Sequence, residues 1–128
     1  MDHIIVPQLG GFETDWHFSH VVRERGLLFL SGITGTDQSG ALPSDPAEQF
    51  EQAFHYLELF LGEANASVDD ILEMTTYHVG LRQHLAGFVE AKDRHIAPPY
   101  PAWSAIGVAE LITEGALVEI RVLARDPR

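Results

Sequence analysis

The sequence contains no cysteine. Disulfides, thiolate nucleophiles and cysteine-bound metals are therefore excluded. Basic residues are also few, because 8 Lys and Arg stand against 19 Asp and Glu, which gives a net charge of −11 with neutral histidines. Proteins hold nucleic acids and anionic membranes largely through Lys and Arg. We therefore expect no nucleic-acid partner and no membrane partner.

Long apolar runs are absent as well. No stretch of 18 apolar residues is available to span a membrane, and residues 1–7 lack the basic and apolar pattern of a secretory leader. These absences favour a cytoplasmic location. The chain does have 128 residues, of which 45% are hydrophobic. That length and composition suit a single domain, residues 1–128, with one hydrophobic core.

Two helices are predicted from apolar spacing and from their terminal residues. The first begins at Pro46, where Asp45 is a good N-cap and Glu48 stands in position to complete a capping box. The second spans 83–96 and ends before a Pro-Pro pair. The residues expected to face the core are, in the first helix, Phe50, Ala53, Phe54, Leu57, Phe60, Leu61 and Ala64, and in the second Leu85, Phe88, Val89 and Ile96.

Six strands are predicted around these helices, at 3–6, 17–23, 27–30, 71–79, 104–109 and 117–124. In the last one, Val118, Ile120 and Val122 alternate with less apolar residues. The element order β-β-β-α-β-α-β-β indicates an α+β fold, a mixed six-stranded sheet with two helices on one face. The other face of that sheet would stay uncovered, and oligomerisation is the usual way to bury such a face.

Motifs for cofactors, metals and activated serines are missing. Gly10 and Gly11 lack the spacing of a dinucleotide-binding loop, and Ser31 does not lie in the G-x-S-x-G pattern of a nucleophile elbow. His17 and His20 have no metal-site spacing with a carboxylate, so we expect solvent-facing or hydrogen-bonded histidines and no metal. No cofactor is expected.

Four segments, taken in order, resemble the RidA/YjgF family of reactive-intermediate deaminases. They are FSHVV at 18–22, LFLSG at 28–32, PYPAWSA at 99–105 and VEI at 118–120. The resemblance runs from about residue 18 to residue 124, and its PYPA-x-S piece is the most specific. It implies a chorismate-mutase-like α+β fold and a homotrimer that binds small molecules in clefts between subunits. In deaminating members, an arginine after Pro-Ala binds the carboxylate of a 2-imino acid, and a glutamate on the last strand helps to hold the attacking water.

The resemblance assigns two catalytic and five substrate-binding positions to this chain. The catalytic groups are the Glu119 carboxyl and the Ala105 backbone carbonyl, and the substrate-binding residues are Phe18, Ser31, Gly32, Val89 and Trp103. Three of these depart from the family pattern, because Phe18 replaces a tyrosine, Val89 an asparagine and Trp103 the arginine. A tryptophan offers one N–H donor and no charge, so it cannot grip a carboxylate as a guanidinium does. We therefore expect poor action on small 2-imino acids.

The sequence leaves several interpretations of the function and of the site residues open. The chain is either an enzyme that hydrolyses an enamine or imine, or a non-catalytic trimer that binds a ligand or another protein. Trp103 suits interface packing as well as an aromatic ligand site, and Glu119 on an alternating strand suits a solvent-facing position. An arginine from an adjacent subunit, one of Arg23, Arg82, Arg94 and Arg121, is a further source of positive charge. The endoribonuclease activity that relatives carry by name conflicts with the charge of −11.

Overall fold

Six strands form one mixed sheet in the order β1-β2-β3-β6-β4-β5, in a computed structural model that describes residues 1–128. Their bounds are β1 Asp2–Ile4, β2 Val21–Glu24, β3 Leu27–Leu30, β4 Ile71–His78, β5 Ala102–Gly107 and β6 Val118–Arg125. Only β4 and β5 run parallel to each other, and the other neighbours are antiparallel. The predicted α+β class with a mixed six-stranded sheet is confirmed.

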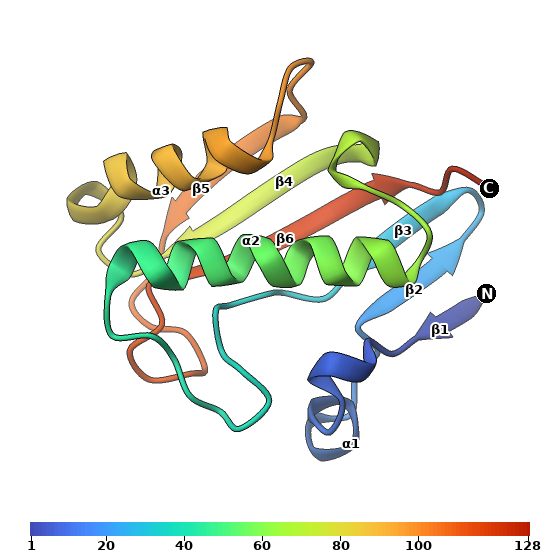
Figure 1. Cartoon of the computed structure of the whole chain (residues 1–128), viewed down its shortest axis with the longest axis horizontal. Coiled ribbons are helices and arrows are strands. Elements are labelled where there is room, and N and C mark those ends of the chain that lie inside the picture. Colours follow the sequence, from blue (N-terminus) through green and yellow to red (C-terminus); the bar gives the residue numbers. More distant parts are fainter.

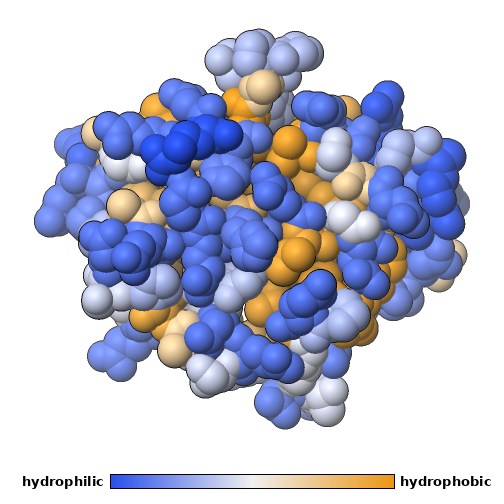
Figure 2. All heavy atoms as spheres, viewed as in Figure 1, coloured by the Kyte–Doolittle hydropathy of each residue, from blue (hydrophilic) through white to orange (hydrophobic).

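Two long helices, α2 (Pro46–Glu63) and α3 (Leu81–His95), lie on the same side of this sheet (Figure 1). Shorter helical pieces stand outside the pair: η1 (Pro7–Leu9), α1 (Phe12–Trp16) and η2 (Val68–Asp70). Even α2, the longest helix, lacks the sustained apolar length that a membrane crossing requires. Figure 2 shows a largely hydrophilic surface on this helix-bearing side, with apolar atoms visible between the polar ones.

The core lies between α2 and the facing side of the sheet. All seven residues predicted for the apolar stripe of the first helix are buried. On β6, Val118, Ile120, Val122 and Ala124 are buried against them, while the residues between these four lie on the other side. In α3, Phe88 is fully buried and Leu85 and Val89 are half-buried, as expected, and Ala91 and Lys92 join the buried side.

Local signals at the helix ends explain where the helices begin and end. The Asp45 side chain accepts a hydrogen bond from the Glu48 N–H, and Pro46 opens the helix, as predicted. The reciprocal half of that capping box does not form. A complete box forms instead at η2, where the Ser67 hydroxyl and the Asp70 carboxylate each accept a backbone N–H.

The structure corrects the sequence-based bounds at the N-terminal end. The predicted strand 17–23 begins only at Val21, because His17 adopts a left-handed backbone with φ 61° and ends α1. The pattern did not predict α1 itself, because five residues are too few to show helical periodicity. The first strand also ends early, at Ile4, and the chain then turns into η1.

Buried polar side chains tie the loops to the helices. The Gln49 amide donates to the carbonyls of Pro43 and Gly115 and accepts the Leu117 N–H, each at 3.0 Å. This one side chain therefore joins the start of α2 to the loop before it and to residues 115–117, which are more than 60 positions away. Arg23 of β2 makes similar connections at the C-terminal end of α2. It donates to the Asp126 carboxylate at 2.9 Å and to the Ala64 carbonyl at 2.6 Å.

A charged cluster joins the two long helices. His95 at the end of α3 bonds to Glu51 at 2.7 Å and to Glu58 at 3.1 Å, and Arg94 bonds to Glu51 as well. Burial lowers the pKa of His95, but the bonds to Glu51 and Glu58 outweigh it and raise the pKa above the ordinary 6.5. The bond from His95 lowers the pKa of Glu51, so both partners favour their charged forms.

We predict that Gln49→Ala lowers the free energy of unfolding by about 1–3 kcal/mol, because it removes a buried side chain and leaves two part-buried carbonyls and one N–H without their partner. Urea unfolding at one fixed protein concentration measures this. Gln83→Ala, at an exposed position of α3, is the matched control and should change stability by less than about 0.5 kcal/mol. Equal effects of the two changes would contradict the assigned role of Gln49.

We predict that His95→Gln destabilises the fold more at about pH 5.5 than at about pH 9. Because the folded-state pKa of His95 is raised, its stabilisation is complete below 6.5 and disappears as the pH rises through the folded value. The difference should be no more than about 1 kcal/mol, since the pair is partly exposed. His55→Gln, at an exposed site of α2, is the control, and urea unfolding at the two pH values gives the comparison.

Candidate functional site

The candidate site begins where β3 leaves the sheet. β3 pairs with β6 up to Phe29, which lies opposite Leu123. The two segments pair once more at a single bridge between Ile33 and Ile120. Between these pairs, residues 30–32 lie opposite only residues 121 and 122, so the β3 side carries one extra residue. Such a bulge redirects the local side chains. It places Gly32 directly beside the side chain of Glu119.

The Glu119 carboxyl lies directly against the backbone of Gly32. A Cβ added to Gly32 would stand 2.6 Å from Glu119 Cδ, which is closer than real atoms approach. Glycine is therefore needed here to leave room for the carboxyl. Burial raises the pKa of Glu119 above its ordinary 4.5, and the nearby Arg121 opposes that rise. The site thus holds a half-buried carboxyl whose charged form is poorly solvated.

A cavity of about 570 Å³ opens beside this carboxyl. Its lining contains three kinds of residues: the apolar Leu9, Phe12, Trp16, Phe18, Ile33, Phe60 and Ile112, the polar His20, Ser31, Thr34, Thr36, Thr113 and Glu119, and the glycines Gly32 and Gly40. Four of the seven predicted site residues are therefore in one cavity: Phe18, Ser31, Gly32 and Glu119. Apolar pockets with a few polar groups are the usual form of a small-molecule site.

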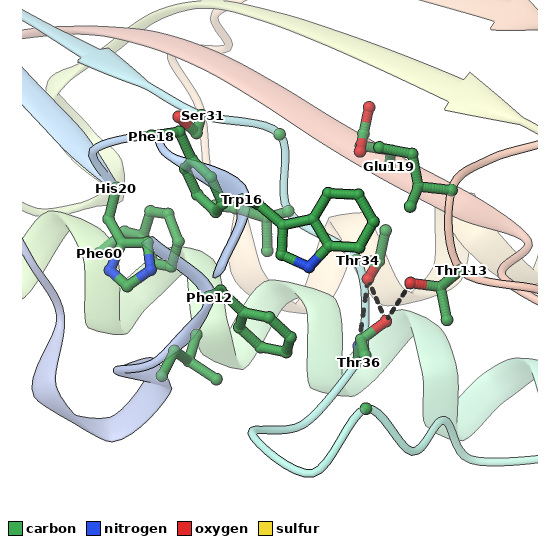
Figure 3. Close-up of a pocket in the computed structure, with 15 residues that line it drawn as sticks. Phe12, Trp16, Phe18, His20, Ser31, Thr34, Thr36, Phe60, Thr113 and Glu119 are labelled. Carbon is green, nitrogen blue, oxygen red and sulfur yellow. Dashed lines mark hydrogen bonds between the residues drawn. The ribbon is translucent and has the colours of Figure 1, made fainter. Parts of the chain in front are cut away.

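Three aromatic side chains near the start of the sequence line one side of the cavity. Figure 3 shows Phe12 and Trp16 projecting from α1, with the indole of Trp16 between Phe18 and the Thr34–Glu119 side of the view. Trp16 is 61% exposed, so its ring is not part of the core. The segment that the sequence pattern left unassigned therefore contributes much of the aromatic lining.

The polar groups of the cavity have defined hydrogen-bond roles. The Ser31 hydroxyl donates to the Ser19 carbonyl at 2.7 Å, which leaves its oxygen lone pairs as acceptors. His20 Nδ1 accepts the Val6 N–H at 2.7 Å, so the ring proton resides on Nε2. Burial lowers the pKa of His20, and the imidazole is therefore neutral at neutral pH.

A chain of threonine hydroxyls closes another side. Thr36 Oγ1 lies 2.5 Å from Thr34 Oγ1 and donates to Thr113 Oγ1 at 3.2 Å (Figure 3). Thr113 belongs to the loop between β5 and β6, whereas Thr34 and Thr36 follow β3. These bonds join two loops at the cavity wall, and no spacing rule in the sequence indicates them.

The other three predicted residues lie away from this cavity, on α3 and β5. The Trp103 indole N–H donates to Thr76 Oγ1 at 2.9 Å, and Lys92 Nζ stands 4.7 Å from the ring centroid. Lys92 is only 7% exposed and makes no ion pair. Its ammonium also lies 5.4 Å from the centroid of the Tyr100 ring. Sequence reasoning missed this lysine, because its contacts come from a different element.

The sheet register separates the two groups of residues within one chain. Ala105 pairs with Thr76, and Thr76 pairs in turn with Ile120. With strands about 4.8 Å apart, Ala105 is about 10 Å from the β6 backbone next to Glu119. The Ala105 carbonyl and the Glu119 carboxyl of the same chain therefore do not meet on one water molecule. Val89, half-buried on α3, also lies outside the cavity lining.

No arginine lines the cavity. Arg23 and Arg94, two of the candidates for supplying a positive charge, are engaged in ion pairs with Asp126 and Glu51. Arg121 alternates with the buried residues of β6 and is exposed on the uncovered face of the sheet. Within one chain, the cavity therefore contains a carboxyl group and no cationic side chain.

Comparisons with known proteins agree with this architecture. The family model described as Endoribonuclease L-PSP matches residues 12–126. The RutC family protein YjgH of Escherichia coli (strain K12) is 35% identical over 111 residues, which cover 86% of this chain and 83% of YjgH. A solved structure of Protein YJGH has a TM-score of 0.92 at 30% identity and covers 99% of this chain and 97% of its own. The crystal structure of RidA from the Antarctic bacterium Psychrobacter sp. PAMC 21119 has a TM-score of 0.79 at 27% identity, covering 84% and 87%.

The four quoted motifs, the sheet order and the cavity at Glu119 thus occur in a chain whose sequence and structure match the same group of proteins throughout. The chain belongs to the RidA/YjgF/YER057c/UK114 family, whose model carries the description Endoribonuclease L-PSP.

Proposed function

We propose that this protein is a RidA-type hydrolase that cleaves an enamine or imine in the cavity beside Glu119. Water adds to the carbon of the C=N bond, the C–N bond then breaks, and the nitrogen leaves as ammonia or an amine while the carbon becomes a carbonyl. The observation that carries the proposal is the half-buried Glu119 carboxyl, held against Gly32 at the edge of an aromatic cavity of about 570 Å³.

Glu119 suits the role of the group that orients and deprotonates the water. A general base works best when its pKa approaches the working pH. Burial moves the pKa of Glu119 upward, in that direction. The Ser31 oxygen, whose own proton is given to the Ser19 carbonyl, adds an acceptor on the same wall.

Trp103 argues against small 2-imino acids as the main substrates. It stands where the family pattern has arginine, and its one polar atom is already bonded to Thr76. The chain therefore fits a subgroup that lacks the substrate-binding arginine. With Phe18 and Val89 also apolar, a larger or less charged imine fits better than a small carboxylate.

We also propose that the protein acts as a homotrimer with the cleft between subunits. The face of the sheet opposite the helices carries exposed apolar side chains, including Phe29 and Ile106. Burying them requires a partner, and a second copy is the simplest one. The separation of about 10 Å between the Ala105 and Glu119 strands supports the same arrangement, because one subunit's β5 would have to complete another subunit's cavity.

Ribonuclease activity is less well supported than imine hydrolysis. The cavity has no Lys or Arg among its lining residues, and the whole chain carries a net charge of −11. Phosphate binding relies on such cations. A non-catalytic ligand-binding trimer is the alternative that the assays below distinguish.

We predict that the protein hydrolyses freshly generated 2-iminopropionate no faster than a buffer blank, measured as pyruvate or ammonia release. Trp103→Arg should restore a rate above the blank. Because the introduced guanidinium would lie beside the Lys92 ammonium, the double change Trp103→Arg/Lys92→Gln is a second variant without the like-charge contact. Circular dichroism checks that each variant is folded. Clear acceleration by the unmodified protein would show that another group binds the carboxylate.

We predict that Glu119→Gln lowers kcat/KM at least about 100-fold for any imine that the protein does hydrolyse. Gly32→Ala should also lower it, because the new methyl group displaces the carboxyl, while stability changes by less than about 1 kcal/mol since the side chain of Glu119 can move. The rate should fall with acid, and the apparent pKa should lie above the ordinary 4.5 of a glutamate. Gly62→Ala, where a Cβ meets nothing within 4 Å, is the matched control. Full activity in Glu119→Gln would exclude the proposed role.

A further inference from the structure

Lys92 is the only lysine of the chain, and its position is unusual for this type of residue. It is only 7% exposed, although proteins almost never bury a lysine unless an acidic group accompanies it. No carboxylate lies within ion-pair distance of its ammonium. None of the side-chain hydrogen bonds made by α3 and β5 involves it. Because burying an unpaired charge costs free energy, the stability of the fold does not explain this lysine.

Two aromatic rings surround the ammonium and leave its N–H bonds unused. Nζ lies 4.7 Å from the centroid of the Trp103 ring and 5.4 Å from that of Tyr100. Ring faces attract a cation, but they offer no oxygen to accept its three N–H bonds. His78 Nδ1 is the only fully buried side-chain nitrogen or oxygen without a partner, so the unpartnered Lys92 Nζ still reaches solvent. A ligand can therefore bind to this positive charge.

Lys92 also stands beside two of the positions that the family resemblance assigns to substrate binding. It follows Val89 by three residues in α3, which places both side chains on one face of that helix. Its ammonium lies against Trp103, the residue at the arginine position, because α3 packs beside β5 (Figure 1). The positive charge that residue 103 lacks is thus present next to it, on a different element.

The proposed trimer would bring this ammonium to the cavity of a neighbouring subunit, because β5 is the strand that would complete that cavity. The neighbour would contribute the Glu119 carboxyl. Arg121, two residues further along β6, lies on the same face of the sheet as Glu119. The assembled cleft would then contain two cations and one acid, and a ligand with one acidic group would balance the remaining charge.

We infer that Lys92 binds the carboxylate of an imine substrate that also has an apolar body. The ammonium would donate to the carboxylate, and the body would pack on the rings of Trp103 and Tyr100. An ammonium makes a point contact, whereas a guanidinium binds a carboxylate through two parallel hydrogen bonds. A small 2-imino acid without such a body would therefore be held weakly. The inference rests on the proposed function for the reaction and the assembly, but the role of Lys92 is measured by binding alone.

The test compares phenylacetate with phenylacetamide, which has nearly the same shape and no charge. Titrations of the full chain follow the indole N–H signal of Trp103 by NMR, and Trp16→Phe assigns it because the chain has two tryptophans. We expect phenylacetate to bind about tenfold more tightly, since it accepts a charge-assisted hydrogen bond. The net charge of −11 opposes any anion, so this preference requires a local cation. Equal Kd values, or a Trp103 signal that phenylacetate does not shift, overturn the inference.

Charge variants assign the preference to Lys92. Lys92→Met keeps the length of the apolar stem and should reduce the preference to less than about twofold, whereas Lys92→Arg should keep it. Arg25→Gln, at an exposed residue of the β2–β3 turn, removes the same charge from the chain and should also keep it. The inference fails if Lys92→Met leaves the preference intact, or if Arg25→Gln reduces it equally.

A purely structural role for Lys92 predicts different results. If its ammonium were permanently paired with an acid of a neighbouring subunit, removing it would leave that acid buried and unpaired and would weaken the assembly. We expect Lys92→Met to keep the mass measured by light scattering and to leave the urea midpoint unchanged or raised. Dissociation or a lower midpoint would assign Lys92 to the interface and overturn the inference. Absence of imine turnover with an intact preference would reject the proposed reaction and leave the carboxylate site standing.

Discussion

Packing of the α2 stripe against β6 is the constraint on which the rest of the structure depends. Phe54 and Leu57 of α2 are fully buried, as are Ile120 and Val122 of β6. Because side chains alternate along a strand, burying these two residues places Glu119 on the other side. A shift of β6 by one residue would exchange the two sets. Core packing therefore determines the position of the carboxyl on which the proposed chemistry rests.

The second constraint is the extra residue after β3. It brings Gly32 against Glu119 while Ile33 returns to pair with Ile120. A backbone without a side chain at that point gives the carboxyl a defined, poorly solvated position. Since α1 adds Phe12 and Trp16 to the same cavity, one acid faces a largely aromatic lining that contains no lysine or arginine.

Sequence patterns predicted the long elements well, because their signals are local and repeated. The apolar stripe of α2 and the alternation on β6 extend over many residues, and capping by Asp45 marks a helix start directly. Short elements were missed or misplaced for the opposite reason. A five-residue helix such as α1 shows barely more than one turn, and the left-handed backbone of His17 depends on its surroundings.

The sequence by itself determined the fold class, the family motifs and the acidic, cysteine-free composition that disfavours nucleic acid. Only the tertiary structure decided which of the predicted site residues share a cavity. Phe18, Ser31, Gly32 and Glu119 come together because two distant chain segments pair at one bulge, whereas Trp103 is placed with Lys92 by the packing of α3 on β5. Such neighbours are far apart in the chain, and their contacts arise from the register of the strands and the packing of the helices, which no local pattern specifies.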